Sequence, residues 1–471
     1  MSGTDHAKGK VAELFKRNQV QVPDNRRGFF DEFIKDEKNI AALNSIIQGE
    51  NQLMANWKLQ NRIAEIKAQP VRVINASVGK SYEAVLDFEK LGWTDISGWE
   101  FEGLEEAGLI FDQKRKLLTG KPKQSGDLKL TLKYKLDGQK EDDPFNEKVI
   151  TLIINPDPKS LWKNLESDKN DPYWKEDNVT VFSKLGDRHI LASSKRGRSH
   201  ANVGSFREDD FAFKELENGW SIVAVSDGAG SAKLSRKGSD IACRTVIDFF
   251  SEEAEAKNLA GFDQILEESK SNTAGQGQNP LDLFVYNTLG KAAFTVHKKL
   301  EDFAAKGGCT LKDLSCTLIF TLFKKYESGY AFLSFGVGDC PIGVLNPDSS
   351  EVTLLNWIDV GEFGGGTRFI TMPEIFRNEK FATRFSFKLI KDFSYLVLMS
   401  DGIYDPKFVV EASLEDVKKW QEFFKDLSGK NEDGITVELN PENKEITNQL
   451  SAWMDFWSTG NHDDRTLVLV F

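Results

Sequence analysis

The spacing of apolar residues changes along the chain, and the first stretch has the spacing of a helix. Apolar residues in Ile40–Ile47, followed by Leu53 and Trp57, recur every three or four positions within an otherwise polar sequence. Pro70 ends this pattern, because proline cannot continue a helical hydrogen-bond ladder. We therefore predict a helical N-terminal segment over residues 1–68.

The next stretch has a period of two. In Asp127–Leu136, leucine and tyrosine alternate with lysine and threonine, which is typical of a strand with one buried face. Turn-forming residues precede this run in Gly120–Asp127. We predict a small β-sandwich over residues 69–158, followed over residues 159–178 by a linker rich in Pro, Asp, Asn and Lys.

From residue 179 to residue 471, strand-like and helix-like runs alternate. Short apolar runs such as Ile222–Val225 and Tyr395–Met399 are soon followed by an acidic residue, whereas Lys237–Phe250 has helical spacing. Runs of this length are typical of central strands whose ends carry function. The whole chain is therefore predicted to be an α+β protein.

The composition and net charge of the chain disfavour some classes of binding partner. The 471 residues include 73 acidic and 61 basic ones, a formal charge of −12, which disfavours a broad nucleic-acid surface. The N-terminal residues lack the apolar core of a signal peptide, and no run of about 18 apolar residues occurs. We expect a soluble, cytoplasmic protein with neither nucleic acid nor membrane as a partner.

The cysteines do not indicate a zinc site. The chain has four, none of them in CxxC spacing, and they are Cys243, Cys309, Cys316 and Cys340. We predict that they are buried free thiols rather than zinc ligands or disulfides.

Acidic residues stand where several apolar runs begin or stop. They are Glu208, Asp209, Asp210, Asp227, Asp339, Asp401, Asp405, Asp463 and Asp464. Any one of them could belong to an ordinary turn, such as the Asp-Gly turn of a hairpin. Several together would raise one another's pKa and destabilise the fold unless a cation lay among them.

The donor type selects the cation. Because the candidate ligands are all oxygens, Mg²⁺ or Mn²⁺ suits them better than Zn²⁺. Two such ions about 3.5–4 Å apart can share a bridging water, lower its pKa and direct it at a phosphorus atom. The pattern therefore predicts hydrolysis of a phosphate ester.

Six motifs in this order resemble those of the metal-dependent PP2C-type protein serine/threonine phosphatases. They are Arg207–Phe211, Val225–Ser231, Ser315–Phe320, Gly336–Gly343, Leu398–Asp405 and Asp463–Val470. Arg196–Gly204, Asp227–Cys243 and Gly361–Thr371 are similar to a bacterial branch of that family. The resemblance implies a PP2C-like α-β-β-α sandwich over residues 179–471, with two antiparallel sheets flanked by helices and a metal site at one end.

The resemblance also implies roles for the first acidic motifs. Asp209 and Asp227 would be the central, catalytic metal ligands, with Asp227 bridging two Mn²⁺ or Mg²⁺ ions. The main-chain carbonyl of Gly228 would be a further ligand, since glycine lets the chain bend close to a metal. Glu208 would hold metal-bound water.

The later motifs complete the implied metal site. Asp401 and Asp463 would join the first site, and Asp339 and Asp405 match positions that bind a third, weaker ion. Asp464 stands where relatives commonly carry Asn, so it could compete with Asp463 for the ligand role. We prefer Asp463.

Two positions depart from the family pattern. Many eukaryotic relatives have a histidine two residues after the bridging aspartate as a candidate general acid, whereas this chain has Ala229. His200 is a candidate for the missing proton donor, with a structural histidine as the alternative. The phosphate-binding arginine of the family has three candidates here, of which we rank Arg198 ahead of Arg196 and Arg207.

Outside the phosphatase-like region, residues 69–158 resemble bacterial immunoglobulin-like modules, with their Gly-x-Pro turn and long alternating strand. We interpret them as a binding or spacing module. The glycine-rich stretch Gly361–Phe369 lacks the Gly-Lys-Ser/Thr ending of a phosphate-binding P-loop, so we expect a loop near the cleft.

Three functions are compatible with these motifs. The first is a phosphatase that acts on phosphoserine and phosphothreonine in a protein substrate, with a serine/threonine kinase as a second partner implied by the bacterial branch. The second is a catalytically inactive PP2C-fold binding or sensing module, which predicts loss of a core ligand. The third is another two-metal hydrolase such as a nuclease, for which the acidic chain offers no basic track. Since no core ligand is lost, the sequence favours the phosphatase.

Overall fold

A computed structural model describes residues 3–271, 279–359, 366–377 and 379–471. The chain divides into two compact units, Met1–Leu161 and Trp162–Phe471. Most of the segment 159–178, which we expected to be a linker, thus belongs to the second unit. Of Gly361–Phe369, residues 361–365 lie outside the described residues.

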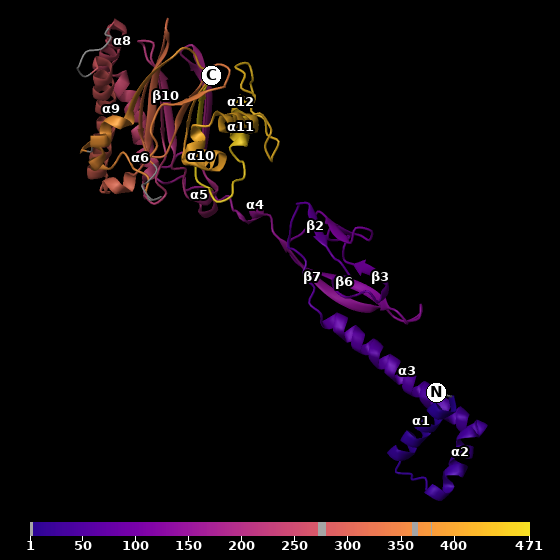
Figure 1. Ribbon diagram of the computed structural model, residues 1–471. Helices are drawn as coiled ribbons and strands as arrows, with labels where there is room; N and C mark the ends of the chain where they lie inside the picture. Colours follow the sequence, from indigo (N-terminus) through magenta and orange to yellow (C-terminus); the bar gives the residue numbers. More distant parts are fainter. Residues whose placement is uncertain (1–2, 272–278, 360–365, 378) are drawn as a thin grey trace. The chain divides into compact units, whose positions relative to one another are not determined.

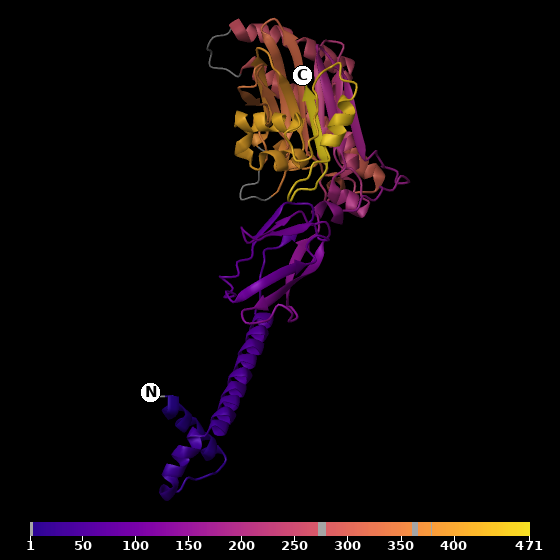
Figure 2. The same ribbon diagram turned by 90° about the vertical axis from the view of Figure 1, so that its right-hand side faces the viewer.

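The first unit begins with helices, as the apolar spacing predicted. They are α1 (Gly3–Arg17), a 3-10 turn η1 (Asp24–Arg26), α2 (Arg27–Lys35) and α3 (Glu37–Ala68). Asp36 caps α3 by accepting hydrogen bonds from the main-chain N–H groups of Lys38 and Asn39. This helix continues for 32 residues and ends at the sheets of the same unit, where Ile66 is buried (Figure 2).

Two sheets follow α3 and share one core. The four-stranded sheet has the order β1 (Ala76–Ser77), β7 (Asn146–Asn155), β6 (Gly126–Leu136), β3 (Ile96–Glu102), and the three-stranded sheet has the order β2 (Tyr82–Val85), β5 (Leu117–Gly120), β4 (Leu109–Asp112). Leu130, Leu132 and Tyr134 of β6 are buried at alternate positions, as the period of two predicted. A short helix, α4 (Pro158–Leu161), ends the unit. The immunoglobulin-like identity of this pair of sheets stays a prediction.

The second unit has two antiparallel sheets. The first has the order β10 (Asp210–Glu215), β11 (Ser221–Ser226), β12 (Leu318–Tyr326), β13 (Gly329–Val337), β16 (Phe385–Ile390). The second has the order β15 (Val352–Leu354), β14 (Ile342–Leu345), β17 (Tyr395–Met399), β18 (Arg465–Val470), β9 (Arg188–Lys195), β8 (Asn178–Leu185).

Helices cover the outer face of each sheet (Figure 1). On the first sheet lie α6 (Ser235–Ser251), α7 (Glu253–Ala260), α8 (Phe262–Ser271) and α9 (Pro280–Gly307). On the second lie α10 (Asp401–Phe408), α11 (Val417–Leu427) and α12 (Ile446–Trp453). The remaining short elements are α5 (Arg198–Val203), η2 (Leu311–Leu314), η3 (Pro373–Arg377), η4 (Glu379–Arg384) and η5 (Glu411–Leu414).

The central strands are buried on both faces, which explains their continuous apolar runs. In β11, Ile222 and Ala224 pack against the helices, whereas Val223 and Val225 pack against the second sheet. This is the α-β-β-α layering that the resemblance implied. Within the described part of the chain, no helix is both long and apolar enough to cross a membrane.

Candidate metal centre

The antiparallel register brings the first set of acidic residues to one end of the first sheet. Asp210, at the start of β10, pairs with Ser226, at the end of β11, so Asp209 and Asp227 are neighbours. Leu318, at the start of β12, pairs with Val337, at the end of β13, which places Asp339 at the same end.

The second sheet presents its acids at a matching end. Met399, the last residue of β17, pairs with Leu467 near the start of β18. Asp401 follows β17 and Asp463 precedes β18, so both carboxylates lie where these strands meet. The two sheet ends meet, since Oγ1 of Thr466 in β18 donates a hydrogen bond to Oδ2 of Asp209 (2.7 Å).

Burial and mutual repulsion dominate the electrostatics of this cluster. Burial raises the pKa of Asp227 well above its usual value, and the negative charges of neighbouring carboxylates raise it further. The pKa of Asp401 is raised by burial and then by the charges of Asp463, Asp339 and Asp209. Burial also raises the pKa of Asp209, which is 1% exposed, and that of Asp339.

Several of these carboxylates have a buried oxygen that no protein group satisfies. Among the described residues, Oε2 of Glu208, Oδ1 of Asp339 and Oδ1 of Asp401 have no hydrogen-bond partner. Glu208 is 6% exposed, and burial raises its pKa to about 7. Because unpaired buried oxygens are costly, each of them fits a cation bound beside it.

Close packing against the main chain of Glu208 requires a glycine at position 228. A Cβ atom at this position would lie 2.6 Å from the carbonyl oxygen of Glu208 and 2.9 Å from its Cβ. Glycine therefore lets the Asp227–Gly228 turn approach the Glu208–Asp209 main chain, as a metal centre formed by both segments needs.

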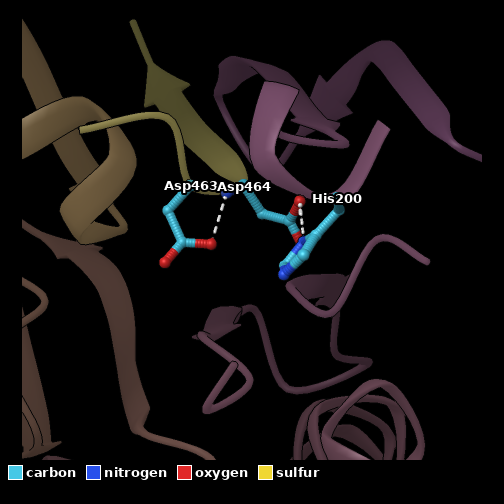
Figure 3. Close-up of side chains that lie close together, drawn as sticks. All are labelled: His200, Asp463 and Asp464. Carbon is cyan, nitrogen blue, oxygen red and sulfur yellow. Dashed lines mark hydrogen bonds and ion pairs between the residues drawn. The ribbon is translucent and has the colours of Figure 1, made fainter. Parts of the chain in front are cut away.

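Asp463 and Asp464 point in different directions (Figure 3). Asp464 accepts hydrogen bonds from the main-chain N–H of Gly197 (2.5 Å), from that of Glu208, and from Nδ1 of His200 (2.9 Å). Oδ1 of Asp463 accepts only a hydrogen bond from the main-chain N–H of Asp464 (2.8 Å) among the described contacts. Asp464 is thus held by three protein donors, although its carboxylate also lies within 4.8 Å of possible ligand atoms of His200 and Asp463, and the choice of Asp463 as the ligand stays a prediction.

Asp339 and Asp405 each accept a hydrogen bond from a polar side chain. Oδ2 of Asp339 accepts a hydrogen bond from Oγ1 of Thr367 (2.7 Å), and Oδ2 of Asp405 accepts one from Nδ2 of Asn461 (3.1 Å). Cys340 lies beside this group, since its sulfur and carboxylate oxygens of Asp227 and Asp339 all lie within 4.8 Å of one another.

All four cysteines are free. Three are buried as predicted, whereas Cys309 is partly exposed. The proximity of Cys340 to the acids was not foreseen, although Cys340 directly follows Asp339 in the sequence.

The three candidate arginines differ in the hydrogen-bond acceptors of their guanidinium groups. Arg207 is 3% exposed and donates to the carbonyl of Asp209 and to Oγ of Ser194. Arg196 donates to the carbonyls of Ser205 and Leu165. Arg198 donates to the carbonyl of Asp455 (2.6 Å), and its buried Nε has no described partner. Arg198 is the one of the three that keeps a buried N–H group without a described acceptor.

His200 reaches the loop in which Ala229 lies. Its Nε2 is 3.9 Å from the position that a Cβ of Gly230 would occupy. Burial acts to lower the pKa of His200, but the hydrogen bond and charge of Asp464 outweigh it and raise the pKa to about 9. The imidazole is therefore protonated at neutral pH.

The sequence model of the Protein phosphatase 2C family matches residues 196–454. No match to the chain was found among curated proteins.

Among solved structures, the serine/threonine phosphatase Stp1 from Staphylococcus aureus is 15% identical and covers 62% of this chain and 96% of its own, with a TM-score of 0.36. The S. agalactiae serine/threonine phosphatase is 14% identical, covering 60% of this chain and 99% of its own, with a TM-score of 0.35. RsbX, solved in complex with magnesium, is 14% identical, covering 62% of this chain and 98% of its own, with a TM-score of 0.33.

Proposed function

The chain belongs to the protein phosphatase 2C family, whose sequence model matches more than half of it, and on this premise we propose that it hydrolyses phosphoserine and phosphothreonine in proteins. The observation that carries the proposal is the convergence of buried carboxylates from both sheets, three of which have an unsatisfied buried oxygen.

The donors present fit a pair of hard divalent cations. In the proposed centre, Asp209, Asp227, Asp401, Asp463 and the carbonyl of Gly228 hold two Mn²⁺ or Mg²⁺ ions, and Glu208 orients water beside them. Asp339 and Asp405 would serve a third ion. Such ions supply an activated water and neutralise charge on the phosphoryl group when bound. The protein residues hold these donors in a buried, rigid setting.

Two further side chains are assigned to the substrate. Arg198 is proposed to bind the phosphate, because its Nε is buried without a described acceptor and a guanidinium can donate two parallel hydrogen bonds to phosphate oxygens. His200 is proposed to protonate the leaving serine or threonine oxygen, since it is charged at neutral pH and lies beside the loop that follows Asp227.

Two partners are proposed for the enzyme. A phosphorylated protein is the substrate, and a serine/threonine kinase is a second candidate partner. The N-terminal unit, with its helices and two sheets, is proposed to recruit one of them. The presence of every acidic ligand position favours an enzyme over an inactive binding module.

Phosphatase activity can be tested directly on the purified full chain. We would measure hydrolysis of p-nitrophenyl phosphate and of a phosphothreonine peptide with Mn²⁺, with Mg²⁺ and with a chelator. Activity should require metal and should be nearly abolished by Asp227→Asn. Asp392→Asn, which changes an exposed acid that pairs with Arg188, is the matched control and should keep full activity. A folded protein without turnover in either metal would instead support the inactive binding module.

A further inference from the structure

A lysine from outside the family-matched region reaches the back of the metal centre. Lys175 precedes residues 196–454, and its side chain is only 14% exposed. Its Nζ donates to the carbonyl of Asp209 (2.7 Å) and lies 3.4 Å from the carbonyl of Glu208. It also contacts Oδ2 of Asp210 (3.2 Å) and Oγ of Ser239 in α6 (3.2 Å). One ammonium group thus contacts three consecutive residues of the first acidic motif.

A second cation reinforces the same main chain. Nη1 of Arg207 also donates to the carbonyl of Asp209 (2.6 Å), and its Nε donates to the carbonyl of Glu176 (2.9 Å). The carbonyl of Asp209 therefore accepts from two cationic side chains, one of which is in turn bound to the residue next to Lys175. These hydrogen bonds fix the main chain that carries the Glu208 and Asp209 side chains, whereas the carboxylates themselves face the acidic cluster.

The segment that carries Lys175 is itself tied to the second unit. Asp171 forms an ion pair with Arg236 of α6 (2.8 Å), and Asp177 forms one with Arg196 (3.1 Å). At its start, the ring of Trp162 lies 4.5 Å from that of His462, the residue before Asp463. Residues 162–177 thus contact both the loop before β10 and the loop before β18.

A buried lysine needs a physical reason, because desolvation opposes its charge. Burial lowers the pKa of Lys175, while the charge of Asp210 opposes this effect. A well-packed apolar side chain would stabilise such a site at least as well. The hydrogen bonds that Lys175 donates to the ligand-bearing main chain are what an apolar side chain cannot supply.

We propose that Lys175 is a positioning residue of the metal centre, which fixes the main chain of Glu208 and Asp209 so that both carboxylates are held toward the bound cations. The inference rests on the proposed function, because it presupposes that these carboxylates serve metal ions. By this inference, the segment 162–177 contributes to the metal centre of the phosphatase unit.

The direction in which Mn²⁺ affinity changes when Lys175 is replaced distinguishes a positioning role from a purely electrostatic one. Lys175 carries a positive charge close to the centre, so its removal by charge alone would strengthen the binding of Mn²⁺. Loss of positioning has the opposite effect, since residues that orient metal ligands typically contribute about 10- to 100-fold in metal affinity.

The test is Mn²⁺ binding to the full chain, measured by the electron paramagnetic resonance signal of free Mn²⁺, together with thermal unfolding. Lys175→Met should weaken Mn²⁺ binding by about tenfold or more. Lys324→Met is the matched control, because Lys324 is 18% exposed, pairs with Asp263 and lies toward the end of β12 remote from the acids. This control should lower stability while leaving Mn²⁺ affinity within about twofold of wild type.

The outcomes distinguish this inference from the proposed function. If wild type binds no Mn²⁺, the proposed function fails. If wild type binds Mn²⁺ and Lys175→Met binds it equally well or more tightly, the positioning role is overturned while the metal centre stands. Should Lys175→Met fail to fold, Lys175→Gln decides, because its amide is polar but its side chain is shorter than that of lysine and cannot make all of the contacts that Nζ makes with Glu208, Asp209 and Asp210. This variant should also bind Mn²⁺ more weakly than wild type, and unchanged affinity would overturn the inference.

Discussion

The imidazole of His200 donates its Nδ1 proton to the carboxylate of Asp464, at 2.9 Å, beside the loop that follows Asp227. The resemblance implied a candidate general acid within that loop, a histidine in many eukaryotic relatives, where this chain has Ala229. His200 belongs to α5, so the structure brings an imidazole to the same neighbourhood from another element.

This pairing predicts a pH profile. Because the pKa of His200 is raised to about 9 and the protonated form is the donor, activity on a phosphothreonine peptide should fall as pH rises through about 9. His200→Asn should lower kcat on the peptide by about 100-fold and remove this alkaline decline. Hydrolysis of p-nitrophenyl phosphate, whose leaving group needs no proton, should lose far less. Equal losses on both substrates would argue for a structural histidine.

Asp464 and Asp463 should respond differently to loss of charge. Asp464→Asn places an amide N–H₂ group where the carboxylate now accepts from N–H donors, so the free energy of unfolding should fall by about 2 kcal/mol. Asp463→Asn should leave the unfolding free energy of the metal-free protein unchanged or higher, because it removes a repelling charge, and should weaken Mn²⁺ binding. Urea unfolding and Mn²⁺ titration measure the two effects. The reverse pattern would make Asp464 the ligand.

The metal-free protein should become less stable as pH rises. Burial and mutual repulsion raise the pKa of Glu208 to about 7 and raise those of Asp227 and Asp401, so the folded protein binds more protons than the unfolded chain. Stability from these groups is complete below their unfolded pKa values near 4 and is lost as pH rises through the folded values. Tm in a chelator should therefore be lower at pH 8 than at pH 6.

Saturating Mn²⁺ should reduce or reverse this difference in Tm, because the cation binds the ionised carboxylates. Glu208→Gln is the control variant and should flatten the dependence in the chelator. A metal-free Tm that does not change between pH 6 and pH 8 would contradict the predicted repulsion.

Gly228 and Gly230 offer a matched pair of substitutions two residues apart. Gly228→Ala would place a methyl group 2.6 Å from the carbonyl oxygen of Glu208, so the main chain must shift. We expect a loss of about 1–3 kcal/mol in stability and much weaker Mn²⁺ binding. In Gly230→Ala the nearest atom would be 3.9 Å away, so both quantities should stay close to wild type. Thermal unfolding and Mn²⁺ titration would show whether the two variants differ.

The resemblance to the phosphatase family implied the layers of the second unit, whereas the apolar runs themselves predicted only central strands, such as Ile222–Val225, which is buried on both faces. Asp227, Asp339, Asp401 and Asp463 each lie within two residues of a strand end, and the antiparallel registers bring the ends of neighbouring strands together. The sequence could not locate Lys175, which lies in a polar stretch where neither helical nor strand spacing indicates burial. Nor could it separate Asp463 from Asp464, since adjacent residues differ only in the direction of their side chains, which the loop before β18 decides.

Two of the strands that lead into the acidic cluster, β11 and β18, are buried at every residue. A cluster of like charges usually relaxes by local opening of the segment that carries it, yet here the segment is held between two packed layers. We therefore expect the main-chain amides of β11 and β18 to exchange hydrogen for deuterium only through global unfolding, even without metal. Chelation would then lower their protection uniformly, by lowering the stability of the whole unit, rather than by fraying the strand ends.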